Sequence, residues 1–167
     1  MRATRLGGVH DPKVLGAVAA VSREDFVLPA SVPLAHIDAP LRIPCGQTTS
    51  QPSLVARMLE ALQLSRRKTV LEVGTGLGYE AALLGRLALQ VWTVEFFPEL
   101  AAMARSNLAR SGTGNVEVMV GDGAEGLSAH APYDAIVLVA ATPRISAELT
   151  PARFVPMLGT NSPGGPG

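Results

Sequence analysis

The sequence predicts an α/β protein with a doubly wound, mostly parallel sheet, and three observations support this prediction. Short runs rich in β-branched residues alternate with amphipathic helical segments through the middle of the chain. A glycine-rich turn separates the first of these strands from the helix that follows it. Further along, residues 133–141 form an almost continuous apolar run, which is typical of a strand buried on both faces.

The N-terminal third is expected to form two helices joined by an irregular arm. Asp11 and Pro12 suit an N-cap and a first helical residue, so a helix is predicted over residues 11–26. Prolines interrupt residues 27–44, which indicates an extended arm that wraps around the rest of the protein. Apolar side chains recur at helical spacing in residues 51–64 and predict an amphipathic helix there.

The central residues then alternate regularly between strands and helices. Predicted strands cover residues 69–73, 90–95, 116–121 and 133–141, and predicted helices cover residues 79–89 and 98–112. Such alternation with short links requires right-handed crossovers and places helices on both faces of the sheet. We therefore divide the chain into an N-terminal helix and arm (1–51), a sheet core (52–150) and an irregular, disordered tail (151–167).

Composition and charge argue against several classes of protein. The 167 residues include 14 basic and 14 acidic side chains, and no basic patch alternates with aromatic residues, so a dedicated nucleic-acid binder is not expected. The apolar stretch at residues 14–21 is too short to span a membrane. The single cysteine, Cys45, fits the reducing cytoplasm, and the histidines lack the spacing of metal ligands. These features predict a soluble cytoplasmic protein without a metal site.

The glycine-rich turn after the first central strand is the strongest local signal of a ligand site. Gly74, Gly76 and Gly78 follow Glu72, whereas the dinucleotide fingerprint needs a further glycine where this chain has Tyr79. Pyrophosphate disfavours a nearby carboxylate, but a cationic ligand tolerates it. The acid therefore favours S-adenosylmethionine over a dinucleotide. Two alternatives stay open: an ordinary strand-to-helix turn, and a Glu72 carboxylate that caps the N–H groups of the turn.

Two further acids follow the next two strands. Glu95 ends the second strand, where a carboxylate can accept both hydroxyls of a ribose, and Asp122 follows the third, where it can accept a hydrogen bond from an adenine amino group. Each acid alone is as readily a loop or capping residue. Together with Glu72, however, they place an acid at three strand ends along one edge of the sheet. Ligands bind at that edge in such folds.

Several segments, in this order, resemble the protein-L-isoaspartate O-methyltransferase family. They are "VSREDFV", "GQTTSQP", "VLEVGTGLGYEAALL", "VEFFPELAAMARSNL", "NVEVMVGDG" and "APYDAIVLVAATP". The resemblance runs from about residue 10 to about residue 150 with family-like spacing. The glycine turn alone would indicate only some methyltransferase, and "GQTTSQP" narrows the resemblance to this family. It implies a Rossmann-like methyltransferase fold.

The resemblance also implies a reaction and a set of site residues. The family transfers a methyl group from S-adenosylmethionine to the free carboxylate of isoaspartyl residues in damaged proteins or peptides, and Ser50 matches the serine that it assigns to catalysis. The implied cofactor contacts are Gln47, Thr48, Thr49, Glu72, Glu95, Asp122 and Gly123, beside the glycines of the turn. Because a carboxylate is already ionised near neutral pH, Ser50 would orient it and not attack. Ser50 could equally be a helix N-cap, and both roles could hold at once.

The segment at residues 144–158 begins as in the family, but the chain then departs from it. Family members continue with further strands, whereas here "GTNSPGGPG" closes the sequence. Without those strands, residues 133–141 would form an apolar edge with unpaired backbone groups, and the chain could self-associate there. We expect a C-terminally truncated chain. Pairing of this edge with another subunit, or a cover formed by residues 150–158, are the alternatives.

Three rival functions remain open at this stage. The chain could esterify the carboxylate of another peptide, or it could be an inactive remnant that only binds cofactor or a partner. A nicotinamide-dependent dehydrogenase is disfavoured by Glu72 and by Tyr79 at the expected glycine. Only tests with substrates and cofactors separate these hypotheses.

Overall fold

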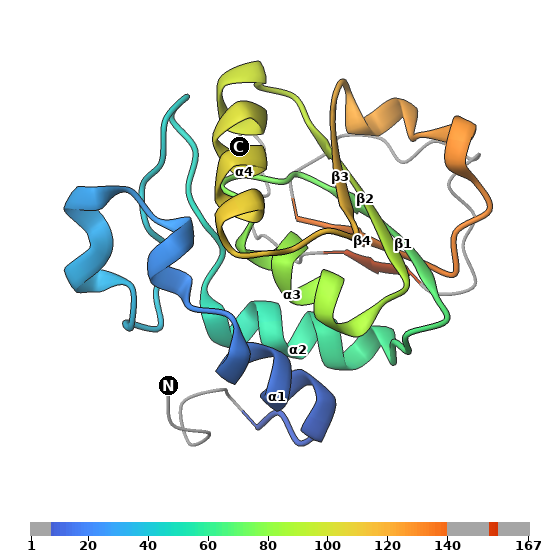
Figure 1. Ribbon diagram of the computed structural model, residues 1–167, viewed down its shortest axis with the longest axis horizontal. Helices are drawn as coiled ribbons and strands as arrows, with labels where there is room; N and C mark the ends of the chain where they lie inside the picture. The colour runs from blue at the N-terminus through green and yellow to red at the C-terminus, as the bar shows by residue number, and fades with distance from the viewer. Residues whose placement is uncertain (1–7, 140–153, 157–167) are drawn as a thin grey trace, which may run out of the picture.

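The computed structural model describes residues 8–139 and the backbone of residues 154–156. Within this part, five parallel strands form one sheet in the order β3-β2-β1-β4-β5 (Figure 1). The strands are β1 (Thr69–Val73), β2 (Gln90–Glu95), β3 (Val116–Val120), β4 (Ala135–Leu138) and β5 (Phe154–Pro156). The predicted α/β class and the parallel sheet are therefore confirmed.

Strand β4 is not the edge of the sheet that the sequence predicted. It pairs with β1 on one side and with β5 on the other, where Ile136 lies opposite Phe154 and Leu138 opposite Pro156. Residues 150–158 were predicted, as one alternative, to cover this edge, and part of them instead forms strand β5 beside it. This strand lies in the segment 151–167, which was expected to be irregular. The remainder of 151–167 lies outside the described residues. Self-association through an exposed β4 loses its premise.

In the described part of the chain, four α-helices accompany the sheet, and their starts follow the sequence signals. They are α1 (Pro12–Ala20), α2 (Pro52–Leu62), α3 (Tyr79–Leu87) and α4 (Pro98–Arg110). Asp11 caps α1, since its carboxylate accepts a hydrogen bond from the Lys13 N–H at 2.8 Å. The predicted helix over 11–26 ends early, at Ala20, and a separate 3₁₀ helix follows at Arg23–Phe26.

The arm after this 3₁₀ helix is less irregular than its prolines suggested. Pro29–Leu34 forms another 3₁₀ helix, and Arg42 pairs with Thr48 in an antiparallel bridge. The Ile43 N–H donates to the Gln47 carbonyl at 3.0 Å, which tightens the turn between the bridged residues. The arm therefore reaches the sheet as a hairpin-like loop.

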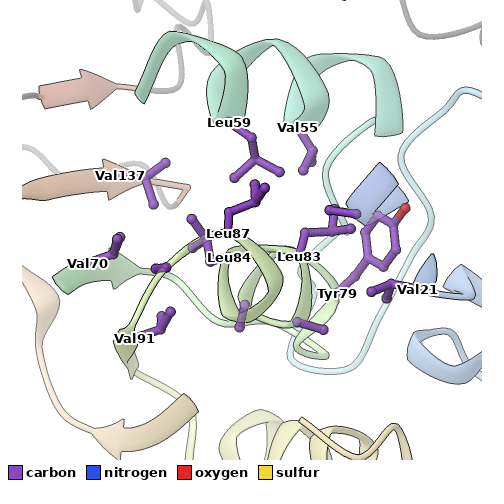
Figure 2. Packing of buried hydrophobic residues seen from close by; sticks show 14 of the residues in the cluster. Val21, Val55, Leu59, Val70, Tyr79, Leu83, Leu84, Leu87, Val91 and Val137 are labelled. Carbon is purple, nitrogen blue, oxygen red and sulfur yellow. The ribbon is translucent and has the colours of Figure 1, made fainter. Parts of the chain in front are cut away.

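The main core lies between the sheet and the four helices (Figure 2). Because side chains alternate along a strand, Val70, Val91 and Val137 point to this helical face, where Leu59 and Leu84 meet them. The opposite face carries a second cluster: Leu71, Val73, Val94, Tyr133, Ile136 and Leu138. Among the described residues all four α-helices cover one face, and residues 140–153, which precede β5, lie outside that description.

Candidate active site

A cavity of about 420 Å³ opens at the carboxyl ends of the strands. The loop after β1 and the end of β2 form one side, and the start of the 3₁₀ helix at Gly123–Glu125, after β3, continues it. The arm, at residues 43–50, contributes to the same wall. The fold thus brings together a polar stretch and a glycine loop that are separated by more than twenty residues in the sequence.

Most residues predicted for the site line this cavity. They are Gln47, Thr48, Thr49, Ser50, Gly74, Gly76, Glu95, Asp122 and Gly123. Gly78 and Glu72 are not among the lining residues that the structure describes. Gly78 instead sits against α4, where an added Cβ would lie 3.4 Å from Leu108 Cγ. Its role in the described structure is close packing of α3 on α4.

The glycine loop is fastened by Glu95. Gly74 and Gly76 have φ angles of 98° and 57°, a left-handed conformation that other residues rarely adopt. The Gly76 N–H donates to Glu95 Oε2 at 2.8 Å, and the Phe97 N–H donates to Glu95 Oε1 at 3.0 Å. Glu95 therefore ties the loop to the turn between β2 and α4. The capping of the loop that the sequence suggested for Glu72 belongs to Glu95.

Glu72 lies inside the protein, beneath α3. Its side chain is fully buried, and Oε2 accepts a hydrogen bond from Thr93 Oγ1 at 2.5 Å, while Oε1 has no partner among the described residues. Thr93 Oγ1 in turn lies 2.6 Å from Thr75 Oγ1. Burial, with Glu80 and Glu95 nearby, raises the pKa of Glu72 well above its usual range. Any effect of this acid on a ligand would act from behind the wall of the cavity.

Glu80, which sequence reasoning missed, does line the cavity. It lies in the first turn of α3 and is only 5% exposed, and its two carboxyl oxygens have no hydrogen-bond partner in the described part of the chain. Burial raises the pKa of Glu80 to about 8. A glutamate is common in the first turn of any helix, so the sequence held no signal for this environment.

The arm is held over the cavity by a buried cation that was also missed. Arg23 is 4% exposed, and its guanidinium donates hydrogen bonds at 3.0–3.3 Å to five acceptors along the arm. These are the carbonyl oxygens of Ala35, Ile37, Ala39 and Ser50 and the Thr49 hydroxyl. Arg23 therefore fixes the backbone on which the predicted catalytic serine lies.

Ser50 itself does not cap α2. The N-cap is Gln51, without a side-chain capping bond, so the alternative interpretation of Ser50 as the N-cap is wrong. An acid from the arm takes this role, since Asp38 Oδ1 accepts from the Ser53 N–H at 2.8 Å and Asp38 Oδ2 from Gln51 Nε2 at 2.9 Å. Ser50 lines the cavity, so its hydroxyl remains a candidate to contact a ligand there.

The described residues contain neither a candidate metal centre nor a membrane-spanning helix. Within the described ranges, no group of three or more histidine, cysteine, aspartate or glutamate side chains is placed to hold a metal ion. Across the same ranges, no helix has both the length and the apolar character needed to cross a membrane.

Comparison with known proteins points to one family. The family model for protein-L-isoaspartate(D-aspartate) O-methyltransferase matches residues 1–152. A protein-L-isoaspartate O-methyltransferase of Koribacter versatilis is 52% identical over 150 residues, which cover 90% of this chain and 66% of that protein. One of Methanoculleus marisnigri is 49% identical over 141 residues, or 84% and 64% of the two chains. The chain thus spans less than two thirds of the length of these relatives.

Solved structures give the same result for the fold. A protein-L-isoaspartate O-methyltransferase superposes with a TM-score of 0.70 at 33% identity, over 80% of this chain and 44% of that one. A Plasmodium falciparum protein assigned the same activity, in complex with S-adenosyl-L-homocysteine, superposes with a TM-score of 0.73. The alignment covers 85% of this chain and 72% of that one at 20% identity, so it supports the fold alone.

Proposed function

Since this chain belongs to the protein-L-isoaspartate(D-aspartate) O-methyltransferase family, we propose that it transfers a methyl group from S-adenosylmethionine to the free carboxylate of L-isoaspartyl residues in damaged proteins or peptides. The observation that carries the proposal is the cavity in which the polar stretch of the arm faces the glycine loop and the acidic strand ends. Methoxide leaves an ester far more readily than oxide leaves an ionised carboxylate. The neighbouring backbone amide nitrogen can therefore attack the ester carbonyl and close a succinimide with loss of methanol. Water can then open this ring to normal aspartate, which is a repair.

The chemistry of the cavity wall suits S-adenosylmethionine. Its volume of about 420 Å³ falls in the usual range for pockets that hold small molecules. Glu80, Glu95 and Asp122 line it, whereas no lysine, arginine or histidine does so among the described lining residues. Such a wall suits a cationic donor and disfavours a pyrophosphate. Each Glu95 oxygen already accepts one N–H and has lone pairs left for the ribose hydroxyls.

The bound donor would supply an electrophilic methyl group on a positively charged sulfur. The acceptor carboxylate is ionised near neutral pH, so no general base is required from the protein. The residues of the chain then have to position the carboxylate oxygen in line with the methyl group and to exclude water from it. We assign the orientation of the carboxylate to the Ser50 hydroxyl, whose backbone Arg23 holds in place.

Methyl transfer to a synthetic peptide tests the proposal. Labelled methyl should pass from S-adenosylmethionine to an isoaspartyl peptide and not to the same peptide with normal aspartate. Equal labelling of both peptides would favour the rival activity, esterification of another peptide carboxylate. No labelling, together with no heat on titration with S-adenosylhomocysteine, would favour the inactive remnant.

The role of Ser50 has its own test. We expect Ser50→Ala to lower the rate of methyl transfer about 100-fold, because the acceptor loses its orienting hydroxyl, while the Kd of S-adenosylhomocysteine changes less than about twofold. The exposed Ser106 on α4 provides the control, since Ser106→Ala should change neither quantity. A Ser50→Ala protein that no longer binds the product would contradict the assignment. The cytoplasmic location remains a prediction from the sequence, whereas self-association through β4 is no longer expected because β5 pairs with that strand.

A further inference from the structure

The wall of the cavity contains an acid that the proposed reaction does not use. Glu80 lines the cavity from the first turn of α3, is 5% exposed, and has no hydrogen-bond partner for either carboxyl oxygen in the described part of the chain. Behind it on β1, the fully buried Glu72 has one carboxyl oxygen, Oε1, that likewise lacks a hydrogen-bond partner among the described residues. An ionised carboxylate that is buried without a partner costs free energy, so Glu80 is stabilised either by binding a proton or by contact with a cation.

The charges that face Glu80 do not supply this cation. Glu72 on β1, Glu95 at the end of β2 and Asp122 after β3 are all acids. Arg23 is close enough to the neighbouring Tyr79 to interact with it electrostatically. Its guanidinium, however, already donates to five acceptors on the arm, so it does not serve as the partner of Glu80. The basic residues Lys13, Arg66 and Arg86 line a separate depression at the other end of α3, so they do not face Glu80.

The methyl donor and its product differ at one atom that matters here. S-adenosylmethionine carries a positively charged sulfur, and S-adenosylhomocysteine carries a neutral one on an otherwise matching frame. A buried carboxylate beside the cavity discriminates between them by charge, because Coulomb interactions are strong where water is excluded. The protonated form of the same group does not.

We propose that Glu80 distinguishes the cationic methyl donor from the neutral product. The Glu80 carboxyl keeps its proton when the cavity holds no sulfonium, and it releases that proton to solvent when the sulfonium enters. After methyl transfer the sulfur is neutral, the carboxyl takes up a proton again, and the product loses its electrostatic advantage. This inference rests on the proposed function, since it requires that both molecules bind in this cavity.

The proposal predicts how the two affinities change with pH. Burial raises the pKa of Glu80 to about 8, so the ionised fraction grows as the pH rises through that value. The affinity for S-adenosylmethionine relative to S-adenosylhomocysteine should therefore rise about five- to thirtyfold between pH 6.5 and pH 9, the upper figure being the growth of the ionised fraction itself. Below the pKa, binding of the donor, but not of the product, should release a proton.

Isothermal titration calorimetry with the two molecules tests this inference. The ratio of the two Kd values is measured between pH 6.5 and pH 9 for the native chain and for Glu80→Gln. Proton release is measured at pH 7 in buffers of different ionisation enthalpy. The variant should show a constant ratio and no proton release, and comparison at each pH cancels any titration of the ligands themselves. Glu80→Leu should give the same result and serves if the amide variant does not fold.

Two further variants make the result specific. Glu117→Gln removes an exposed acid on β3 away from the cavity and should leave the pH dependence of the ratio intact. Loss of that dependence in Glu72→Gln but not in Glu80→Gln would overturn the inference. A native ratio that is constant with pH, with both molecules bound, would overturn it alone. Failure of both molecules to bind would remove the proposed function as well.

Discussion

The arm and the sheet face each other across the cavity, and each buries charge in a different way. On the arm side, the guanidinium of Arg23 is 4% exposed and donates to five acceptors. On the sheet side, which we take to include the start of α3 after β1, Glu72 of β1 and Glu80 of α3 are as deeply buried. One hydrogen bond, from Thr93, is all that the described residues offer to their four carboxyl oxygens. The cation is satisfied and the acids are not.

This difference separates a structural ion from functional ones. A buried ion with all its hydrogen bonds fixes the chain around it, and its removal leaves several acceptors without a donor. Buried acids without partners lower stability, so their presence beside a cavity is better explained by a ligand than by the fold. Stability measurements on the two sides should therefore move in opposite directions.

The largest effect is expected on the arm side. Arg23→Met should lower the free energy of unfolding by about 3–5 kcal/mol and abolish methyl transfer, because four carbonyl groups and the Thr49 hydroxyl lose their donor. Arg23→Lys, which keeps the charge but not the planar fork, should fall between this variant and the native chain. Urea denaturation measures both. An Arg23→Met protein as stable as the native chain would show that the arm does not depend on this ion.

On the sheet side, removal of an acid should stabilise the protein, and increasingly so at higher pH. A buried Glu80 with a pKa of about 8 binds a proton that the unfolded chain gives up near pH 4.5, so the native free energy of unfolding falls as the pH rises between these values. Relative to the native chain, Glu80→Leu should gain about 2–4 kcal/mol between pH 4.5 and pH 8. Urea denaturation at several pH values measures this gain. Glu117→Gln, on the exposed surface, should show no such trend.

The smallest effect concerns the single hydrogen bond that the acids do receive. Thr93→Val removes the donor to Glu72 and should lower the free energy of unfolding by about 1 kcal/mol at neutral pH. It should also raise the pKa of Glu72 further, because the hydrogen bond from Thr93 is what lowers it. Thr75→Val, whose hydroxyl reaches Thr93 and not Glu72, should cost less. If the free energy of unfolding fell equally in the two variants, the hydrogen bond from Thr93 to Glu72 would contribute no more stability than the one between Thr93 and Thr75.

The features that could be predicted from the sequence are those that depend on local pattern. Strands β1 to β3, the four helices and the glycine loop follow from periodicity and from residues such as Asp11 and Pro12, whose neighbours in the chain decide their roles. The convergence of the strand ends follows from the parallel order alone. Strand β5 could not be predicted, because three residues that end in Pro156 have little strand signal of their own.

The roles of individual acids depended on tertiary structure. Glu95 is the last residue of β2 and reaches the loop, whereas Glu72 is followed by another residue of β1 and points into the helical layer. Because Glu72 pairs with Thr93, Glu95 lies two residues further toward the carboxyl edge on the same face of the sheet, and this position lets it cap the glycine loop. Arg23 and Glu80 were missed because their environments come from segments distant in the sequence, and neither belongs to a motif.

The attachment of the arm to one side chain has a mechanical consequence. Arg23 joins residues 35, 37, 39, 49 and 50 at a single point, and the Leu41 N–H and the Thr49 N–H lock the same loop from within. We therefore expect the loop to open as one cooperative unit, when all of these bonds break together, and not residue by residue. The entrance of the cavity would then be either open or closed, with few intermediate states.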